Sequence, residues 1–195
     1  MRVALGLVLS LLTGAVPGLL ACHATEDFVV VPDPPIRSTI SNTPEGGRVL
    51  LQEVYVRAPR AVVWDLYTTS EGWRSWVAPA AEVELAVGGR IRTHYTPGAS
   101  LGDPGTNVLR IVNYAAEEFV TLQAELADNW PEVMKQDAEN LTNVILFDAL
   151  APELTRVRSF GLGYRDAPEY DALLDFFVPA NERLLTKLVE VAESR

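Results

Sequence analysis

The chain has 195 residues, 48% of them apolar and 22% charged, a composition typical of one globular domain and not of a disordered or fibrous protein. Its formal charge of −10 opposes binding to a phosphate backbone, so we expect no nucleic-acid partner. One cysteine and two histidines exclude an intrachain disulfide framework and a cysteine-based zinc site. We therefore expect no metal and no cofactor.

The N-terminal segment, residues 1–21, has the features of a secretory signal peptide. Arg2 is followed by an apolar run over residues 3–12 and by small residues before Cys22. The alternative is a transmembrane helix, which needs about 20 predominantly apolar residues. Pro17 interrupts the apolar run, so the sequence favours the signal peptide.

The residues around Cys22 resemble the lipobox of bacterial lipoproteins, since Leu19, Leu20 and Ala21 precede the cysteine. The resemblance implies that Cys22 is acylated and becomes the first residue of the mature chain. It therefore predicts a lipid-anchored protein of the bacterial cell envelope, in contact with a membrane through its acyl chains. His23 stands where that family has Asp for inner-membrane retention, which favours the outer membrane.

The segment 22–47 is predicted to be a flexible tether. It contains four prolines and the pair Gly46 and Gly47, and its apolar residues follow no sustained period. A short edge strand over residues 28–31 is the alternative within it. We accordingly expect one folded domain over residues 48–195.

The segment 48–76 predicts a strand followed by two short helices. Residues 49–57 are rich in Val, Leu and Tyr, which favour a strand. Pro59 suits the first turn of a helix, where its missing N–H costs nothing, and apolar residues then recur at helical spacing. Ser70 is a typical N-cap residue for a second helix that ends at Trp76.

The segment 82–95 predicts a hairpin around Gly88 and Gly89, because a two-residue turn needs positive φ angles that glycine adopts at low cost. Residues 96–105 carry two prolines and three glycines and are expected to form a loop. Further strands are predicted at residues 107–115, 119–127, 141–150 and 154–164.

The C-terminal segment predicts an amphipathic helix over residues 168–193, because its apolar residues form one stripe at the helical period. Pro179 lies inside the segment and is expected to kink the helix or to split it in two. Strands followed by a long helix indicate an α+β fold, with an antiparallel sheet and helices on one face.

Four short motifs occur in order along the chain: VRAPRAVVWDL at residues 56–66, WVAP at 76–79, GGR at 88–90 and TRV at 155–157. Together they resemble homologues of the activator of the heat-shock-protein ATPase, a branch of the START-like (SRPBCC) superfamily. The resemblance implies the helix-grip fold, a curved antiparallel β-sheet wrapped around a long C-terminal α-helix, with two short helices after the first strand. The chain departs from the family pattern at Pro179 and in an extra segment, residues 128–140.

The helix-grip fold leaves a cavity between sheet and helix, which suits a hydrophobic or amphipathic small molecule as partner. The candidate ligand-binding residues are aromatic residues and polar residues that alternate along predicted strands. The alternative role of each aromatic residue is packing in the core. The alternative for each polar residue is a position on the solvated outer face of the sheet. The candidates are Trp76, Tyr95, Gln123, Phe147, Ser159 and Phe177.

No set of catalytic residues converges in the sequence, so we assign none and expect a binding protein in preference to an enzyme. Residues 98–102 match Gly-x-Ser-x-Gly, but that motif needs a preceding strand, a following helix and a later histidine. Strand alternation places His94 opposite Ile91 and Tyr95, which predicts a solvent-exposed histidine.

Two rival functions stay open. One is a cavity enzyme of the cyclase type, which burial of His94 or Glu125 beside Tyr95 would favour. The other is an envelope protein-interaction module, which a large exposed apolar patch would favour. No specific protein partner is assigned.

Overall fold

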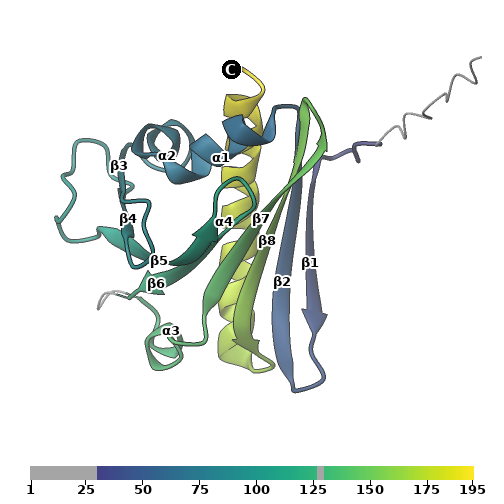
Figure 1. Ribbon diagram of the computed structural model, residues 1–195. Helices are drawn as coiled ribbons and strands as arrows, with labels where there is room; N and C mark the ends of the chain where they lie inside the picture. Colours follow the sequence, from purple (N-terminus) through teal and green to yellow (C-terminus); the bar gives the residue numbers. More distant parts are fainter. Residues whose placement is uncertain (1–29, 127–129) are drawn as a thin grey trace, which may run out of the picture.

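The computed structural model describes residues 30–126 and 130–195, which form one antiparallel sheet with a long helix across one face (Figure 1). The strand order in the described sheet is β1-β2-β8-β7-β6-β5-β4-β3. Its eight strands are β1 (Ile36–Asn42), β2 (Gly47–Val56), β3 (Ala80–Val83), β4 (Arg90–His94), β5 (Asn107–Ala115), β6 (Phe119–Glu125), β7 (Thr142–Ala151) and β8 (Leu154–Arg165). The helices are α1 (Arg60–Thr68), α2 (Ser70–Trp76), α3 (Glu132–Gln136) and α4 (Pro168–Ala192).

The structure confirms the α+β helix-grip fold. Along β2, alternate residues are buried, among them Val54 and Val56, so one face of the sheet carries the core. Figure 1 shows α1 and α2 at the end of the sheet where α4 finishes, and α3 at the end where α4 begins. The space between these two ends is bounded by the sheet and the middle of α4.

The turn between α1 and α2 fixes the tryptophan side chains of α2. The side chain of Thr69, and not that of Ser70, caps α2 by accepting a hydrogen bond from the Gly72 N–H at 3.0 Å. The indole N–H of Trp73 donates to the Tyr67 carbonyl, and that of Trp76 donates to the Leu66 carbonyl. Both indoles are therefore held in fixed orientations at one end of the core.

The hairpin is longer at its turn than the sequence predicted. β3 and β4 are joined by residues 84–89, because Gly88 and Gly89 also bind the neighbouring strand β5. The Gly88 N–H donates to the Ile111 carbonyl and the Ile111 N–H donates to the Gly89 carbonyl, both at 2.8 Å. The positive φ of Gly88, 81°, permits this arrangement.

Helix α4 is continuous through Pro179, so of the two predicted effects, a kink or a split, the split does not occur. An internal proline removes one helical hydrogen bond, but buried residues on both sides of it hold the helix to the domain. Leu173 precedes the proline and belongs to a small apolar cluster with Met134 and Leu141. Leu188 follows it and belongs to the main core.

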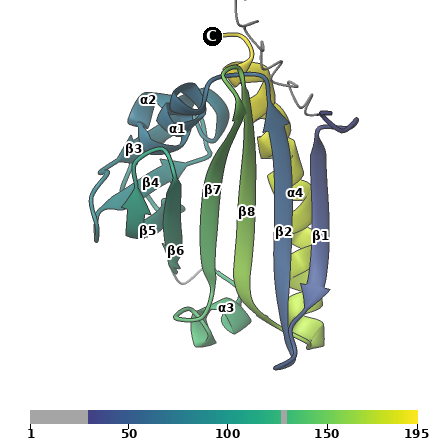
Figure 2. The same ribbon diagram turned by 45° about the vertical axis from the view of Figure 1, so that its right-hand side comes forward.

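The structure corrects the predicted tether of residues 22–47, because residues 36–42 form β1 (Figure 2). All seven residues of β1 pair with β2, from Ile36 opposite Val54 to Asn42 opposite Arg48. Backbone pairing needs no apolar period, so the sequence pattern carried no signal for this edge strand. Val30 and Val31, in the alternative edge strand, lie in no strand, while residues 28 and 29 lie outside the described residues.

The predicted signal peptide and Cys22 also lie outside the described residues. Within residues 30–126 and 130–195, no helix combines the length and the hydropathy that a membrane crossing requires.

Candidate functional site

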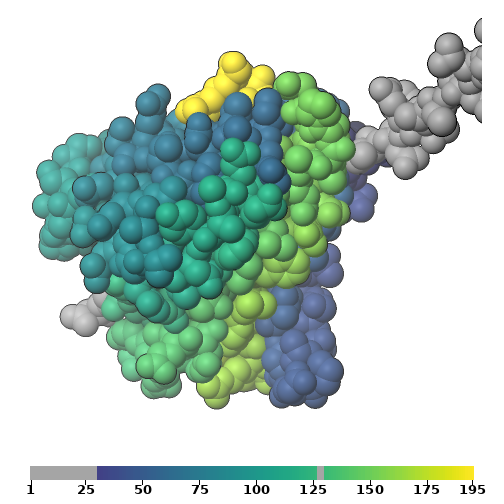
Figure 3. Space-filling view, in the orientation of Figure 1, coloured from purple at the N-terminus to yellow at the C-terminus, as the bar shows by residue number. Residues whose placement is uncertain are grey.

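A cavity of about 1300 Å³ lies between the inner face of the sheet and the middle of α4. Trp73 and Trp76 line one part of it, Leu122 and Ile145 line the sheet side, and Phe177 lines the α4 side. Tyr95 and Phe176 also line it and are 52% and 64% exposed, so they mark its open side. Figure 3 shows the α1–α2 and β3–β6 segments, in blue and teal, covering much of one face of the molecule, with the green α3 region beneath them.

Some polar groups at the cavity are occupied by structural hydrogen bonds. Gln52 is 2% exposed, and its Oε1 accepts from Asn181 Nδ2 at 2.8 Å. Its Nε2 donates to Ser38 Oγ at 3.1 Å, and Ser38 Oγ donates to Glu182 at 2.7 Å. This chain of bonds ties β1 and β2 to α4, so these groups hold the helix in place.

Four of the predicted site residues line this cavity: Trp76, Tyr95, Ser159 and Phe177. Ser159 lies on the inner face of β8, and its Oγ donates to Asn143 Oδ1 on β7 at 2.9 Å. Sequence alternation had grouped Ser159 with Val157, which is fully buried. These residues therefore stay candidates for ligand contact.

The other two predicted site residues, Gln123 and Phe147, lie outside the cavity lining. Gln123 is on the outer face of β6, where its Nε2 donates to the carbonyls of Ala138 and Glu139 at 3.1 and 3.0 Å. Its neighbours Leu122 and Ala124 face the cavity instead, because apolar side chains occupy the inner face of that strand. Gln123 thus fixes the segment that follows α3.

Phe147 is a core residue. It is 1% exposed, and its ring makes edge contacts with Trp64 at 5.3 Å and with Tyr67 at 5.1 Å between centroids. Tyr67, which packs against Phe147, lines the cavity in its place. The sequence indicated the correct face of β7 for Phe147 but carried no signal for the tyrosine that covers it.

His94 is buried, so the predicted exposure is wrong. It is 6% exposed, its Nδ1 accepts from the Thr96 N–H at 3.1 Å, and its Nε2 lies 3.2 Å from the Pro104 carbonyl. The loop over residues 96–105 folds over the outer face of β4 and covers the ring. Both ring nitrogens bind that loop, while Thr93 and Tyr95 on the opposite face line the cavity.

The remaining catalytic candidates also lie away from the cavity lining. Glu125 forms an ion pair with Arg90 at 3.0 Å. Ser100 of the Gly-x-Ser-x-Gly motif is exposed, and its N–H donates to Asp103, so the motif forms a turn. Among residues 30–126 and 130–195, no group of three or more His, Cys, Asp or Glu side chains is placed to hold a metal ion.

The extra segment between β6 and β7 forms one wall of the cavity and is anchored through Asp137. Its buried carboxylate accepts two hydrogen bonds from Arg165, at 2.9 and 2.6 Å, and one each from Tyr170 and Asn140. Arg165, Tyr170 and Asn140 together lower the pKa of Asp137 to about 2. Met134 of α3 lines the cavity, so this anchor also holds a cavity wall.

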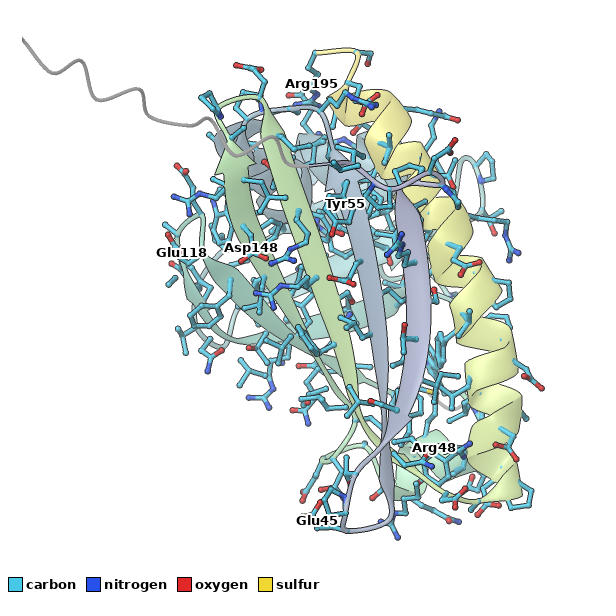
Figure 4. All side chains as sticks on the ribbon, turned by 90° about the vertical axis from the view of Figure 1, so that its right-hand side faces the viewer. Glu45, Arg48, Tyr55, Glu118, Asp148 and Arg195 are labelled. Atoms are coloured by element: carbon cyan, nitrogen blue, oxygen red, sulfur yellow. The ribbon has the colours of Figure 1, made fainter. Side chains whose placement is uncertain are left out.

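Arg48 reinforces the same end of the domain. Figure 4 shows Arg48 at the end of the sheet where α4 begins, with Arg195 at the opposite end. The Arg48 guanidinium donates to the carbonyls of Arg165 and Ala167, and it pairs with Asp171 in the first turn of α4. These bonds fix the start of α4 to β2 and β8.

Comparison with models of known protein families shows which family this chain belongs to. The family described as activator of Hsp90 ATPase homolog 1-like protein matches residues 57–193. The chain belongs to this family. Its match covers α1 through α4 and begins after β1 and β2. A search of curated proteins finds no match.

Solved structures share the fold. Protein Ms6760 from Mycobacterium smegmatis is 17% identical, with a TM-score of 0.58 over 80% of this chain and 96% of its own. The Aha1 dimer from Colwellia psychrerythraea is 14% identical, with a TM-score of 0.55 over 75% and 94%. A norcoclaurine synthase from Thalictrum, bound to a transition-state analogue, is 11% identical, with a TM-score of 0.51 over 80% and 96%. At sequence identities this low, the structural similarity shows a shared fold alone.

Proposed function

We propose that this domain binds a hydrophobic or amphipathic small molecule in the cavity between its sheet and α4. The observation that carries the proposal is the cavity of about 1300 Å³, whose lining includes Trp73, Trp76, Leu122 and Phe177. Ligand sites are concave, mostly apolar and furnished with a few polar groups, which describes this lining. The norcoclaurine synthase neighbour shows the same fold holding a small molecule.

The energetics of packing support an occupied cavity. Apolar side chains that face a void lose their dispersion contacts on that side, and the cost rises with the volume of the void. A molecule that fills the space restores those contacts and removes its own apolar surface from water. Binding therefore stabilises both the ligand and the wall that contains α3.

A tryptophan placed in the cavity tests this proposal. We expect Nile red, a neutral hydrophobic dye, to bind the wild-type protein, and Ala124→Trp to weaken that binding about tenfold or more by filling the space. Ala124 lines the cavity from β6. Fluorescence titration measures the affinity, and Ala149→Trp, at an exposed position of β7, serves as the matched control.

Equal affinity in wild type and Ala124→Trp would contradict the proposal, provided that circular dichroism shows both proteins folded. Loss of binding in the control as well would point to a general effect of the added indole and would count equally against it.

We also propose that the domain is held at a bacterial membrane by acylation of Cys22, as the lipobox resemblance implies. Because β1 begins at Ile36, fourteen residues after the cysteine, the chain between them spans at most about 50 Å. The domain would therefore work close to the membrane surface, within reach of lipid-soluble molecules.

The anchor is tested by replacing Cys22. We expect the wild-type protein to sediment with membranes and to partition into detergent, and Cys22→Ala to lose both properties because no acyl chain can be attached. Membrane fractionation with immunoblotting measures the change. Unchanged membrane association of Cys22→Ala would remove the lipoprotein proposal while leaving the binding cavity unaffected.

A further inference from the structure

Asn143, Ser159 and Tyr164 form a polar patch on the sheet side of the cavity, and all three line it. Asn143 on β7 lies directly opposite Gly161 on β8, and Ser159 lies two residues before that glycine on the same face. Ser159 Oγ donates to Asn143 Oδ1 at 2.9 Å. Two strands thus present neighbouring polar side chains, and Gln52 of β2, whose amide is already hydrogen-bonded within the protein, lies opposite Ser159 on the other side.

Gly161 brings the tyrosine to the patch. A Cβ atom at position 161 would lie 3.1 Å from Cε2 of Tyr164 and 3.5 Å from its hydroxyl, so the ring lies over the glycine. Side chains directly opposite each other in an antiparallel pair have Cβ atoms about 4.5–5.5 Å apart. The Tyr164 hydroxyl and the Asn143 amide are therefore close enough to contact one ligand group.

The patch has unused hydrogen-bond donors. Among the residues that the structure describes, the Tyr164 hydroxyl makes no hydrogen bond, and burial raises the pKa of this tyrosine to about 12, which keeps its proton in place. Asn143 uses its oxygen to accept from Ser159, which leaves the hydrogens of its Nδ2 without a partner in the same part of the chain. The free capacity is thus donor-rich and would bind an oxygen acceptor.

The charges around the cavity argue for a neutral acceptor. The charged residues of the lining are Glu132 on α3 and Glu169 and Arg183 on α4, and all three are exposed. None of them lies on the sheet beside the patch. A ligand carboxylate buried against the patch would have no cation on the sheet to pair with, and a charge buried without a partner is costly.

We propose that Asn143, Ser159 and Tyr164 form a subsite that hydrogen-bonds a carbonyl oxygen of a neutral, largely apolar ligand. This inference rests on the proposed binding function and adds the chemical class of the ligand. The apolar body of the ligand packs between the inner face of the sheet and α4. The carbonyl oxygen accepts from the Tyr164 hydroxyl and from Asn143 Nδ2, while Ser159 fixes the Asn143 amide in the orientation that points its donors inward.

A matched pair of probes tests the subsite. Fluorene and 9-fluorenone share a tricyclic carbon frame and differ at one ring carbon, which bears a carbonyl oxygen only in 9-fluorenone. Equilibrium dialysis gives the affinity ratio of 9-fluorenone to fluorene for each protein. We expect Tyr164→Phe, and separately Asn143→Leu, to lower that ratio about two- to tenfold, the worth of one hydrogen bond. Tyr114→Phe, which removes a hydroxyl outside the cavity lining, is the control and should leave the ratio unchanged.

The outcomes separate the two proposals. If both probes bind wild type and the ratio is the same in Tyr164→Phe, Asn143→Leu and wild type, the subsite is overturned and the binding function stands. If neither probe binds wild type, the binding function is overturned and the subsite with it. A fall in the ratio in both variants, with fluorene affinity unchanged, supports the subsite.

Discussion

The polar residues discussed above fall into two groups: those whose hydrogen bonds are made within the protein, and those that have unused hydrogen-bond donors. Gln52 and His94 are buried, and each binds groups of the protein itself, so both hold structure together. Within residues 30–126 and 130–195, Asn143 and Tyr164 retain unused donors toward the cavity. Because these donors face the cavity and are not used within the described part of the chain, they point to a ligand more strongly than burial alone.

Asp137 provides a test of the wall that contains α3. Its pKa in the folded protein is about 2, below the ordinary value of 3.8, so its contribution to stability is complete above about pH 4 and is lost as the pH falls toward 2. We expect Asp137→Asn to reduce the free energy of unfolding by about 2 kcal/mol at neutral pH, because the charge-assisted bonds to Arg165 are lost. The variant should also lose less stability than wild type between pH 4 and pH 2.

Urea unfolding at pH 6, 4 and 2 measures both effects. Asp175→Asn, which removes a carboxylate from the exposed side of α4, is the control and should behave as wild type. The same loss of stability on acidification in wild type and Asp137→Asn would contradict the role of Asp137.

At the scale of elements, the sequence predicted most strands and helices because apolar period and turn residues specify them locally. The strand at residues 107–115 coincides with β5, and the helix at 168–193 differs from α4 by one residue. β1 was missed because an edge strand is specified by its pairing with β2 and not by its own pattern. The continuity of α4 through Pro179 likewise depends on tertiary packing at both ends of the helix.

The candidate site was less predictable than the fold, because a strand's inner face is known only once its neighbours are in register. Gln123 and Leu122 are adjacent in β6, and only the packed sheet shows that the leucine faces inward. Tyr164 contacts the patch because Gly161 leaves room for its ring, a relation between two residues that no periodic pattern encodes.

At the scale of the molecule, the domain has two apolar clusters with a cavity between them. The main core joins the sheet to α1, α2 and the end of α4, while the small cluster joins α3 to the beginning of α4. The middle of α4 therefore spans the hollow, supported at both ends. This arrangement explains how a domain with a large internal space keeps a defined shape, and it places the polar patch on the rigid sheet.

Native mass spectrometry of the full chain, purified without denaturation, gives the sharpest test of ligand binding. The binding account predicts a complex heavier than the chain by the mass of one neutral small molecule, which dissociates on activation and is absent from Ala124→Trp. A wild-type protein that carries no small molecule and takes up none of the hydrophobic probes offered to it would contradict the account.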